Sequence, residues 1–187
     1  MTLTPLVVAV ALAASPAESP AAPSATAADQ PPKPAAAQML EVGNLKLEVP
    51  AGWTVAKNPE LLLELRAGPD GNRGVLQVSK NKPDDATFLR SQKDLGALAE
   101  KFGQSLGTRG QNWGKPIGNK QTECAMGRLG IALFAGGEFP SMIILQTVGS
   151  RGAYLWTWLG PDPKAAEVEQ TLRLVMAATE VQKKETK

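Results

Sequence analysis

The stretch SMIILQTVGSRGAYLWTWL, at residues 141–159, decides the fold. It predicts two short strands joined by the turn Gly-Ser-Arg-Gly. Successive side chains of a strand point to opposite faces, and here both faces are apolar: Tyr154, Trp156 and Trp158 share one face, and Leu155 and Leu159 share the other. A sheet with one face in water would alternate polar and apolar residues. We therefore expect a sheet that is covered on both faces.

More strands precede this stretch. Strands are expected at residues 40–42 and 45–49 around a Gly43-Asn44 turn, at 61–66, at 74–80 and at 122–136, with a glycine-rich loop over 107–118. The residues Ala51-Gly52-Trp53 predict a tight corner after Pro50, with the Trp53 side chain packed inward. Short turns between grouped strands favour antiparallel pairing.

Two helices are expected to cover the sheet. The first is capped by Asp84 or Asp85 and ends near Gly107, and its apolar residues recur at helical spacing: Phe88, Leu95, Leu98, Ala99, Phe102 and Leu106. Gly96 and Gly103 interrupt this helix, which indicates close packing on the sheet. The second helix is expected to start with Asp162 as N-cap and Pro163 at its first position, and to bury Val168, Leu172, Val175 and Met176.

These elements predict an α+β fold of one domain, residues 39–181. The architecture is an α/β/α sandwich: a mainly antiparallel central sheet, one helix after the third strand and one C-terminal helix.

The rest of the chain has a different composition. Residues 1–14 contain the apolar run LVVAVALAA, which resembles the core of an export signal although residues 1–5 hold no Lys or Arg. A membrane span needs ~20 apolar residues, so this run predicts no transmembrane segment. Residues 15–38 form a Pro/Ala-rich linker expected to be disordered, and 182–187 a charged tail. We expect a periplasmic or secreted protein; the alternative is a disordered leader without a targeting role.

Composition narrows the chemistry. The 187 residues include no histidine and one cysteine, Cys124, and 20 Lys and Arg balance 18 Asp and Glu. Without histidine the chain lacks the commonest general base and metal ligand, so no catalytic, cofactor or metal site is predicted. Cys124 is expected to be a small buried residue rather than a reactive thiol. The balanced charge predicts no nucleic-acid partner.

A family resemblance follows from the order of elements and from one motif. Pro50, Gly52 and Trp53 form a Pro-x-Gly-Trp corner after an N-terminal hairpin, and the helix, strand meander and final helix follow in turn. Over about residues 40–181 this resembles the PsbP-like group, which includes the photosystem subunit PsbP, the Mog-type Ran-binding factor and DcrB-type bacterial envelope proteins. The resemblance implies an accessory or docking module without a shared catalytic site, and no functional residue is carried over.

One loop holds residue types that are enriched at interface hot spots, Arg109 and Trp113. They are the candidate partner-binding residues; alternatively, Trp113 only anchors the start of a strand. The predicted function is a non-enzymatic, exported docking domain that binds another protein of the envelope. The alternative is a carrier of a small apolar ligand, with a pocket between sheet and helix lined by Trp156, Trp158 or Phe134. An enzyme that uses Asp, Glu or Lys is the third class.

Overall fold

The computed structural model describes residues 36–107 and 112–181, with the backbone alone at Pro69 and Gly107. The expected signal (1–14), the linker as far as residue 35 and the tail (182–187) lie outside the described residues. The expected domain organisation therefore stays a prediction at both ends of the chain.

Within the described residues, ten strands form two sheets. The larger sheet has the order β3-β4-β5-β9-β8-β7-β6, and every neighbouring pair is antiparallel. Its strands are β3 (Trp53–Ala56), β4 (Leu63–Ala67), β5 (Gly74–Lys80), β6 (Lys115–Cys124), β7 (Gly127–Ala135), β8 (Ser141–Val148) and β9 (Ala153–Gly160). The smaller sheet has the order β1-β2-β10, from β1 (Gln38–Val42), β2 (Leu45–Val49) and β10 (Thr179–Glu180).

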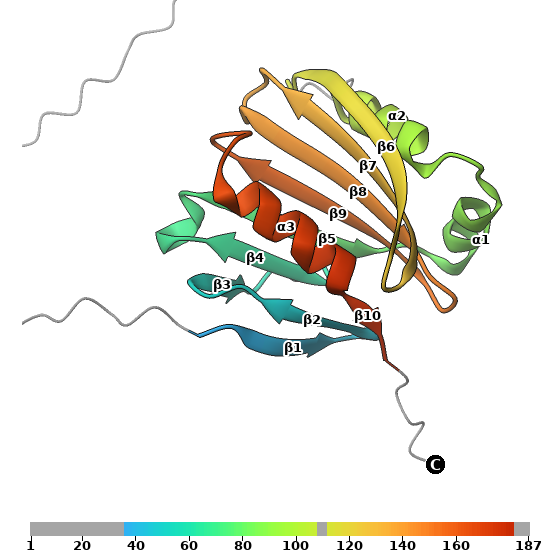
Figure 1. Ribbon diagram of the computed structural model, residues 1–187, viewed down its shortest axis with the longest axis horizontal. Helices are drawn as coiled ribbons and strands as arrows, with labels where there is room; N and C mark the ends of the chain where they lie inside the picture. The colour runs from blue at the N-terminus through green and yellow to red at the C-terminus, as the bar shows by residue number, and fades with distance from the viewer. Residues whose placement is uncertain (1–35, 108–111, 182–187) are drawn as a thin grey trace, which may run out of the picture. The chain divides into compact units, whose positions relative to one another are not determined.

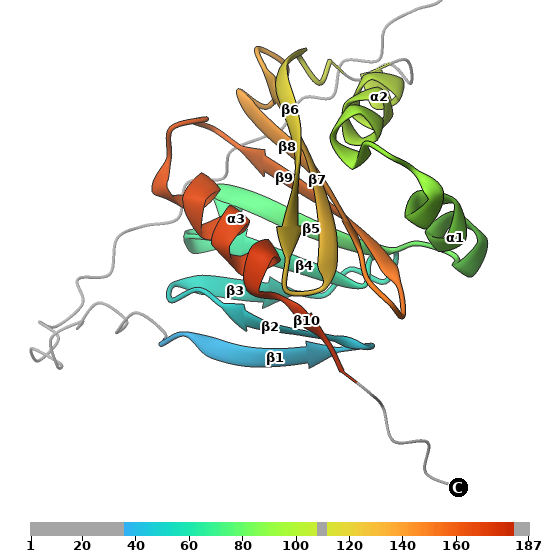
Figure 2. The same cartoon turned by 45° about the vertical axis from the view of Figure 1, so that its right-hand side comes forward.

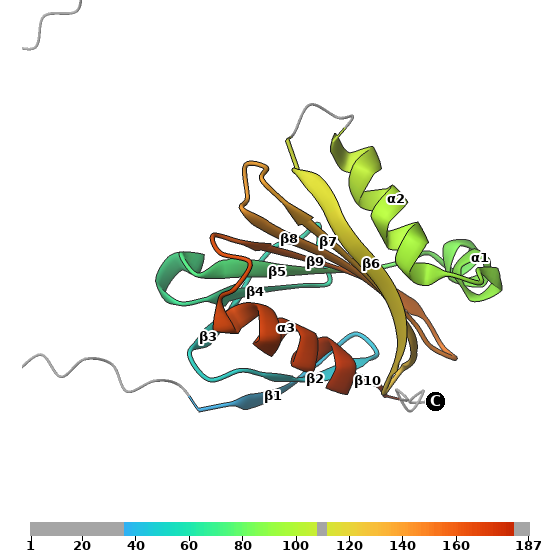
Figure 3. The ribbon, with the colours of Figure 1, turned by 45° about the horizontal axis from the view of Figure 1, so that its top comes forward.

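The helices are α1 (Pro83–Ser91), α2 (Leu95–Gly107) and α3 (Ala166–Ala177), and a short 3-10 turn spans Pro69–Gly71. Figure 1 shows α3 lying across the larger sheet beside the smaller one, while α1 and α2 lie on the other side. The turned views in Figures 2 and 3 show the same separation of α3 from α1 and α2.

One face of the larger sheet packs against α3 and the smaller sheet. Trp156 and Trp158 are completely buried there. Their apolar cluster includes Leu174 and Val175 of α3 and Leu45 of β2. The predicted inward packing of Trp53 is also confirmed, since its ring stacks on that of Trp158 with 5.4 Å between centroids.

The opposite face packs against α2. Leu159 and Ile144 belong to a separate cluster with Ala99 of α2, and Leu155 packs against it. Alternate residues of β8 and β9 thus enter different cores, as the apolar pattern of residues 141–159 predicts. The α+β fold with a mainly antiparallel sheet covered on both faces is confirmed.

The first helix differs from the expectation. Residues 84–106 form two helices, α1 and α2, which follow the fifth strand rather than the third. Lys82, not Asp84 or Asp85, is the N-cap of α1, with Pro83 in its first turn. The break comes at Gln92, whose backbone is extended, and Asp94 Oδ1 then accepts the N–H of Ala97 at 3.0 Å. The Asp94 side chain thereby caps a new helix, and Phe88 is left 55% exposed.

The glycine-rich segment also differs. The loop expected over 107–118 ends at Gly114, and β6 runs from Lys115 to Cys124 and pairs with β7. The single strand expected over 122–136 is therefore a hairpin. Nearly all of the β6 side chains are exposed, because β6 is an edge strand. Such a strand carries no apolar alternation, which is the signal that sequence patterns supply.

The C-terminal helix starts later than predicted. Asp162 Oδ1 accepts the N–H of Lys164 at 2.8 Å and Asp162 O accepts that of Ala165 at 3.3 Å. These bonds close a separate turn, so α3 begins at Ala166 with Ala165 as its N-cap. Of the four residues predicted to be buried, Val175 is buried and Val168 and Leu172 pack half-buried against the same cluster, whereas Met176 is 44% exposed and Leu174 is buried in its place.

Candidate functional site

Of the two predicted partner-binding residues, Arg109 lies outside the described residues, and Trp113 lies just before β6. The Trp113 ring stacks on Phe139 of the β7–β8 loop, with 5.8 Å between ring centroids and 17° between the planes. We call Trp113 and Phe139 the aromatic patch.

Backbone contacts hold the two sides of the aromatic patch together. The N–H of Glu138 donates to Asn112 O at 2.7 Å. Asn112 Oδ1 accepts the N–H of Gly114 at 3.1 Å, which shapes the turn into β6. The segment before β6 and the β7–β8 loop are thus joined at one end of the larger sheet.

Trp113 is half-buried, and its ring contacts both the core and the exposed ring of Phe139. It packs against the cluster that contains Phe134 and Met142. Its indole Nε1 is buried without a hydrogen-bond partner among the described residues. On the outer side Phe139 is 37% exposed, and Ile117 in β6 is 62% exposed. Trp113 therefore anchors the start of β6 and also supports an exposed aromatic side chain; sequence reasoning did not identify Phe139.

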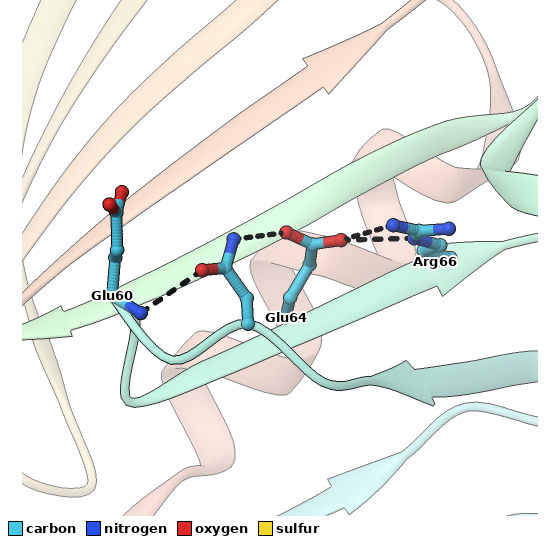
Figure 4. Close-up of polar contacts among 4 residues, drawn as sticks. Glu60, Glu64 and Arg66 are labelled. Atoms are coloured by element: carbon cyan, nitrogen blue, oxygen red, sulfur yellow. Dashed lines mark hydrogen bonds and ion pairs between the residues drawn. The ribbon is translucent and has the colours of Figure 1, made fainter.

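A buried carboxylate lies elsewhere, on β4. Glu64 is 5% exposed. It accepts hydrogen bonds from Asn58 Nδ2 at 3.0 Å and from Arg66 Nε at 2.9 Å, and Arg66 Nη2 approaches to 2.9 Å (Figure 4). The hydrogen bond from Asn58 lowers the pKa of Glu64 most, and the hydrogen bond and charge of Arg66 and a hydrogen bond with Gln77 lower it further, although burial alone would raise it. The carboxylate is ionised and satisfied at neutral pH.

Two other side chains with titratable groups, Cys124 and Tyr154, pack in or against the core. Cys124 ends β6, is half-buried and packs against the larger apolar cluster, where full burial was expected. Burial, and to a lesser degree the charge of Glu180, raises the pKa of the Tyr154 hydroxyl. Within 36–107 and 112–181, no three Cys, Asp or Glu side chains gather as a metal site.

Two apolar pockets lie on the surface of the described residues. One, of about 390 Å³, lies between the β1–β2 hairpin and the β3–β4 connection and includes Leu40, Val55 and Leu62. The other, of about 240 Å³, lies between β2 and α3 and includes Pro50 and Leu174. The aromatic residues expected to line a carrier's cavity, Trp156, Trp158 and Phe134, are at most 1% exposed and lie in the core clusters instead.

No helix in the described part of the chain is both long and apolar enough to cross a membrane.

Comparison with known proteins gives a structural match and no sequence match. No protein-family model matches the chain, and no curated protein matches it. The solution structure of cyanobacterial PsbP (CyanoP) from Synechocystis sp. PCC 6803 is similar, with a TM-score of 0.58 and 13% sequence identity over 83% of this chain and 98% of that one. At this identity the likeness concerns the fold. The predicted resemblance is confirmed at that level: this chain has the fold of the PsbP-like group.

Proposed function

We propose that this chain is a non-enzymatic accessory domain of the cell envelope that docks onto another protein through the aromatic patch. The observation that carries the proposal is the stacked pair Trp113–Phe139, whose outer member is 37% exposed although its ring is large and apolar. Aromatic side chains bury a large area on contact and are enriched among residues that dominate binding energy.

The surroundings of the aromatic patch suit a protein partner. Exposed polar side chains border it, including Asn112, Lys115 and Glu138. An apolar centre with a polar rim is the usual anatomy of a protein interface. Because the patch is held by the Glu138–Asn112 backbone bond and by packing on the core, little ordering is needed when a partner binds.

The non-enzymatic part of the proposal is supported by the state of the titratable groups. A general acid at neutral pH needs a carboxyl group with a raised pKa, whereas the pKa of the buried Glu64 is lowered by its hydrogen bonds. The chain holds no histidine to take the role of base. The envelope location is supported by the apolar run within residues 1–14 and the Pro/Ala-rich segment that follows it.

Chemical cross-linking tests the proposal. The full chain is expressed with a C-terminal tag, cross-linked in intact cells, and the attached protein is identified, purified and titrated against variants. Phe139→Ala should weaken its binding about tenfold or more, which is the effect of removing a hot-spot residue. Met39→Ala on β1 is the matched control, because Met39 is also an exposed apolar side chain (55%) and lies on the other sheet.

Equal binding by wild type and Phe139→Ala would contradict docking through the aromatic patch. Fractionation of the same cells tests the location separately. A full-length product found in the cytosol would contradict export and leave the binding result to stand by itself.

A further inference from the structure

A small polar pocket lies at the other end of the larger sheet. It has a volume of about 190 Å³ and is formed by the end of β5, the helix α1 and the turn between β8 and β9. Its side chains come from Lys80, Asn81, Pro83, Ala86, Thr87, Arg90 and Arg151, and Gly152 completes the wall. Figure 2 shows α1 beside the end of the sheet at which this turn lies.

The lining is cationic. It holds Lys80, Arg90 and Arg151 and no carboxylate. Within the described residues the ion pairs engage four other cations, Lys46, Arg66, Arg73 and Arg173. The three positive charges of the pocket are therefore not neutralised by a direct carboxylate partner in the described part of the chain.

Three acidic side chains lie near the pocket without lining it. Glu180 Oε2 accepts the backbone N–H of Arg151 at 3.0 Å, which places its carboxylate behind Gly152. Asp84 and Asp85 lie in the first turn of α1 and are exposed to solvent. Lys80, Arg90 and Arg151 are exposed as well, but they line one concave site together and no carboxylate lines it, so the charged groups that converge on the site are cationic.

Arg90 is held in place by two hydrogen bonds to backbone carbonyls. Its Nε donates to Gly149 O at 3.1 Å and one Nη donates to Ser150 O at 3.2 Å, so the guanidinium is fixed against the β8–β9 turn. A guanidinium has five N–H donors, and three remain after these two bonds. Asn81 adds a side-chain amide that makes no hydrogen bond within the described residues, while its backbone N–H donates to Ala153 O.

We propose that this pocket binds an oxyanion of the phosphate type. Arginine forks match the oxygen spacing of phosphate and carboxylate groups, and an ammonium and an amide beside them supply further donors. The volume is below the ~300 Å³ at which pockets for drug-sized ligands begin. The pocket therefore accommodates a free phosphate or the phosphate of a lipid headgroup, and the two sources share the same chemistry.

The anion pocket and the aromatic patch are independent sites. The first adjoins the β8–β9 turn and the second the β7–β8 loop, and these are the opposite ends of the eight-residue strand β8. At ~3.3 Å per residue the strand separates them by roughly 25 Å. Failure of one proposal therefore leaves the other untouched.

Titration of the full chain with inorganic phosphate at low ionic strength tests the proposal. Lys80→Gln and Arg151→Gln remove one exposed charge each, and the backbone bond of Arg151 to Glu180 stays in place. Arg90→Gln is less suitable because it also breaks the two bonds to the turn. Lys101→Gln is the matched control: Lys101 is an exposed cation on α2 outside this pocket.

Wild type should bind phosphate saturably, each pocket variant should weaken binding about tenfold, and Lys101→Gln should bind like wild type. A second arm measures flotation with phosphatidylcholine vesicles that contain phosphatidylglycerol. Binding to the vesicles alone, lost in Lys80→Gln and Arg151→Gln, supports the headgroup as the source. Absence of binding in both arms, or equal binding by wild type and both pocket variants, would overturn the proposal.

Discussion

Glu64 is buried on β4, and its charge is balanced by neighbouring side chains rather than by water. Asn58 and Arg66 together donate to both of its oxygens. The side chain of Arg66 is 44% exposed, so solvent screens part of the attraction. The Asn58–Glu64 hydrogen bond ties the β3–β4 connection to β4, so Glu64 has a structural role.

We expect Glu64→Gln to lower the free energy of unfolding at pH 7 by about 1 kcal/mol. The pKa of Glu64 is lowered by folding, so its charge stabilises the fold above the unfolded-state pKa, near 4.5, and the contribution is lost as the pH falls through the folded pKa. The difference between wild type and variant should therefore shrink below pH 4.5. Urea unfolding at several pH values measures it.

Glu60→Gln is the control, since Glu60 contacts Asn58 through its backbone N–H and its carboxylate points away from the cluster (Figure 4). A stability difference for Glu64→Gln that stays constant from pH 7 to pH 3 would contradict this account.

A second residue-scale prediction concerns Trp156. Its indole N–H donates to Thr147 Oγ1 at 2.9 Å, and both side chains are completely buried. Thr147→Val keeps the side-chain volume and leaves the indole without an acceptor, so we expect a loss of about 1–3 kcal/mol in the free energy of unfolding. Thr147→Ser keeps the hydroxyl and should lose less. Equal losses for the two variants in thermal or urea unfolding would contradict a role for the hydrogen bond.

At the scale of elements, α2 lies against the sheet because two of its residues lack side chains. A Cβ added at Gly96 would come 2.5 Å from the carbonyl oxygen of Lys120 in β6, and one at Gly103 would overlap the ring of Phe134 in β7. The close packing that the sequence indicated for both glycines is confirmed. An added Cβ would meet backbone atoms at Gly96 and side-chain atoms at Gly103.

Gly96→Ala is therefore expected to destabilise the protein despite the better helix propensity of alanine. Propensity alone would add about 1 kcal/mol, whereas overpacking against a fixed backbone costs about 1–3 kcal/mol. We expect a net loss of about 1 kcal/mol in urea unfolding. Gly118→Ala in β6 is the control, because a Cβ at Gly118 meets no atom within 4 Å. A stabilising effect of Gly96→Ala would show that α2 does not lie this close to β6.

The elements that sequence patterns predicted well are those with buried periodic residues. Strands β8 and β9 and the pairing of their ends follow from apolar residues on both faces. In contrast, β6 is exposed along its length and gave no periodic signal. The short strand β10 is defined by its pairing with β2, where Thr179 lies opposite Lys46. Residues that pair across a separation of 133 positions leave no local pattern in the sequence.

Only part of the candidate site could be predicted, again because residues far apart in the sequence meet there. Trp113 was identified from its residue type, but Phe139 follows a hairpin turn 26 residues later and meets Trp113 only through the sheet register. The three cations of the anion pocket likewise come from β5, α1 and the β8–β9 turn. Composition located none of these groupings, because each is created by strands that bring distant segments to one end of the sheet.

At the scale of the molecule, the larger sheet separates two surfaces with different chemistry. The end with the β7–β8 loop carries the aromatic patch, and the end with the β8–β9 turn carries the anion pocket. Between them β8 is buried at every residue. The core of the described residues holds its largest aromatic side chains: Trp158 stacks on Trp53, and Tyr154 packs beside Trp156.

The most direct test of docking is the hydrogen-exchange footprint of the partner identified by cross-linking. On addition of that partner to the full chain, we predict slower amide exchange in residues 112–117 and 136–140, with exchange in the β8–β9 turn at 149–152 unchanged. Slower exchange confined to other segments, with residues 112–117 and 136–140 exchanging as in the free protein, would contradict docking through the aromatic patch.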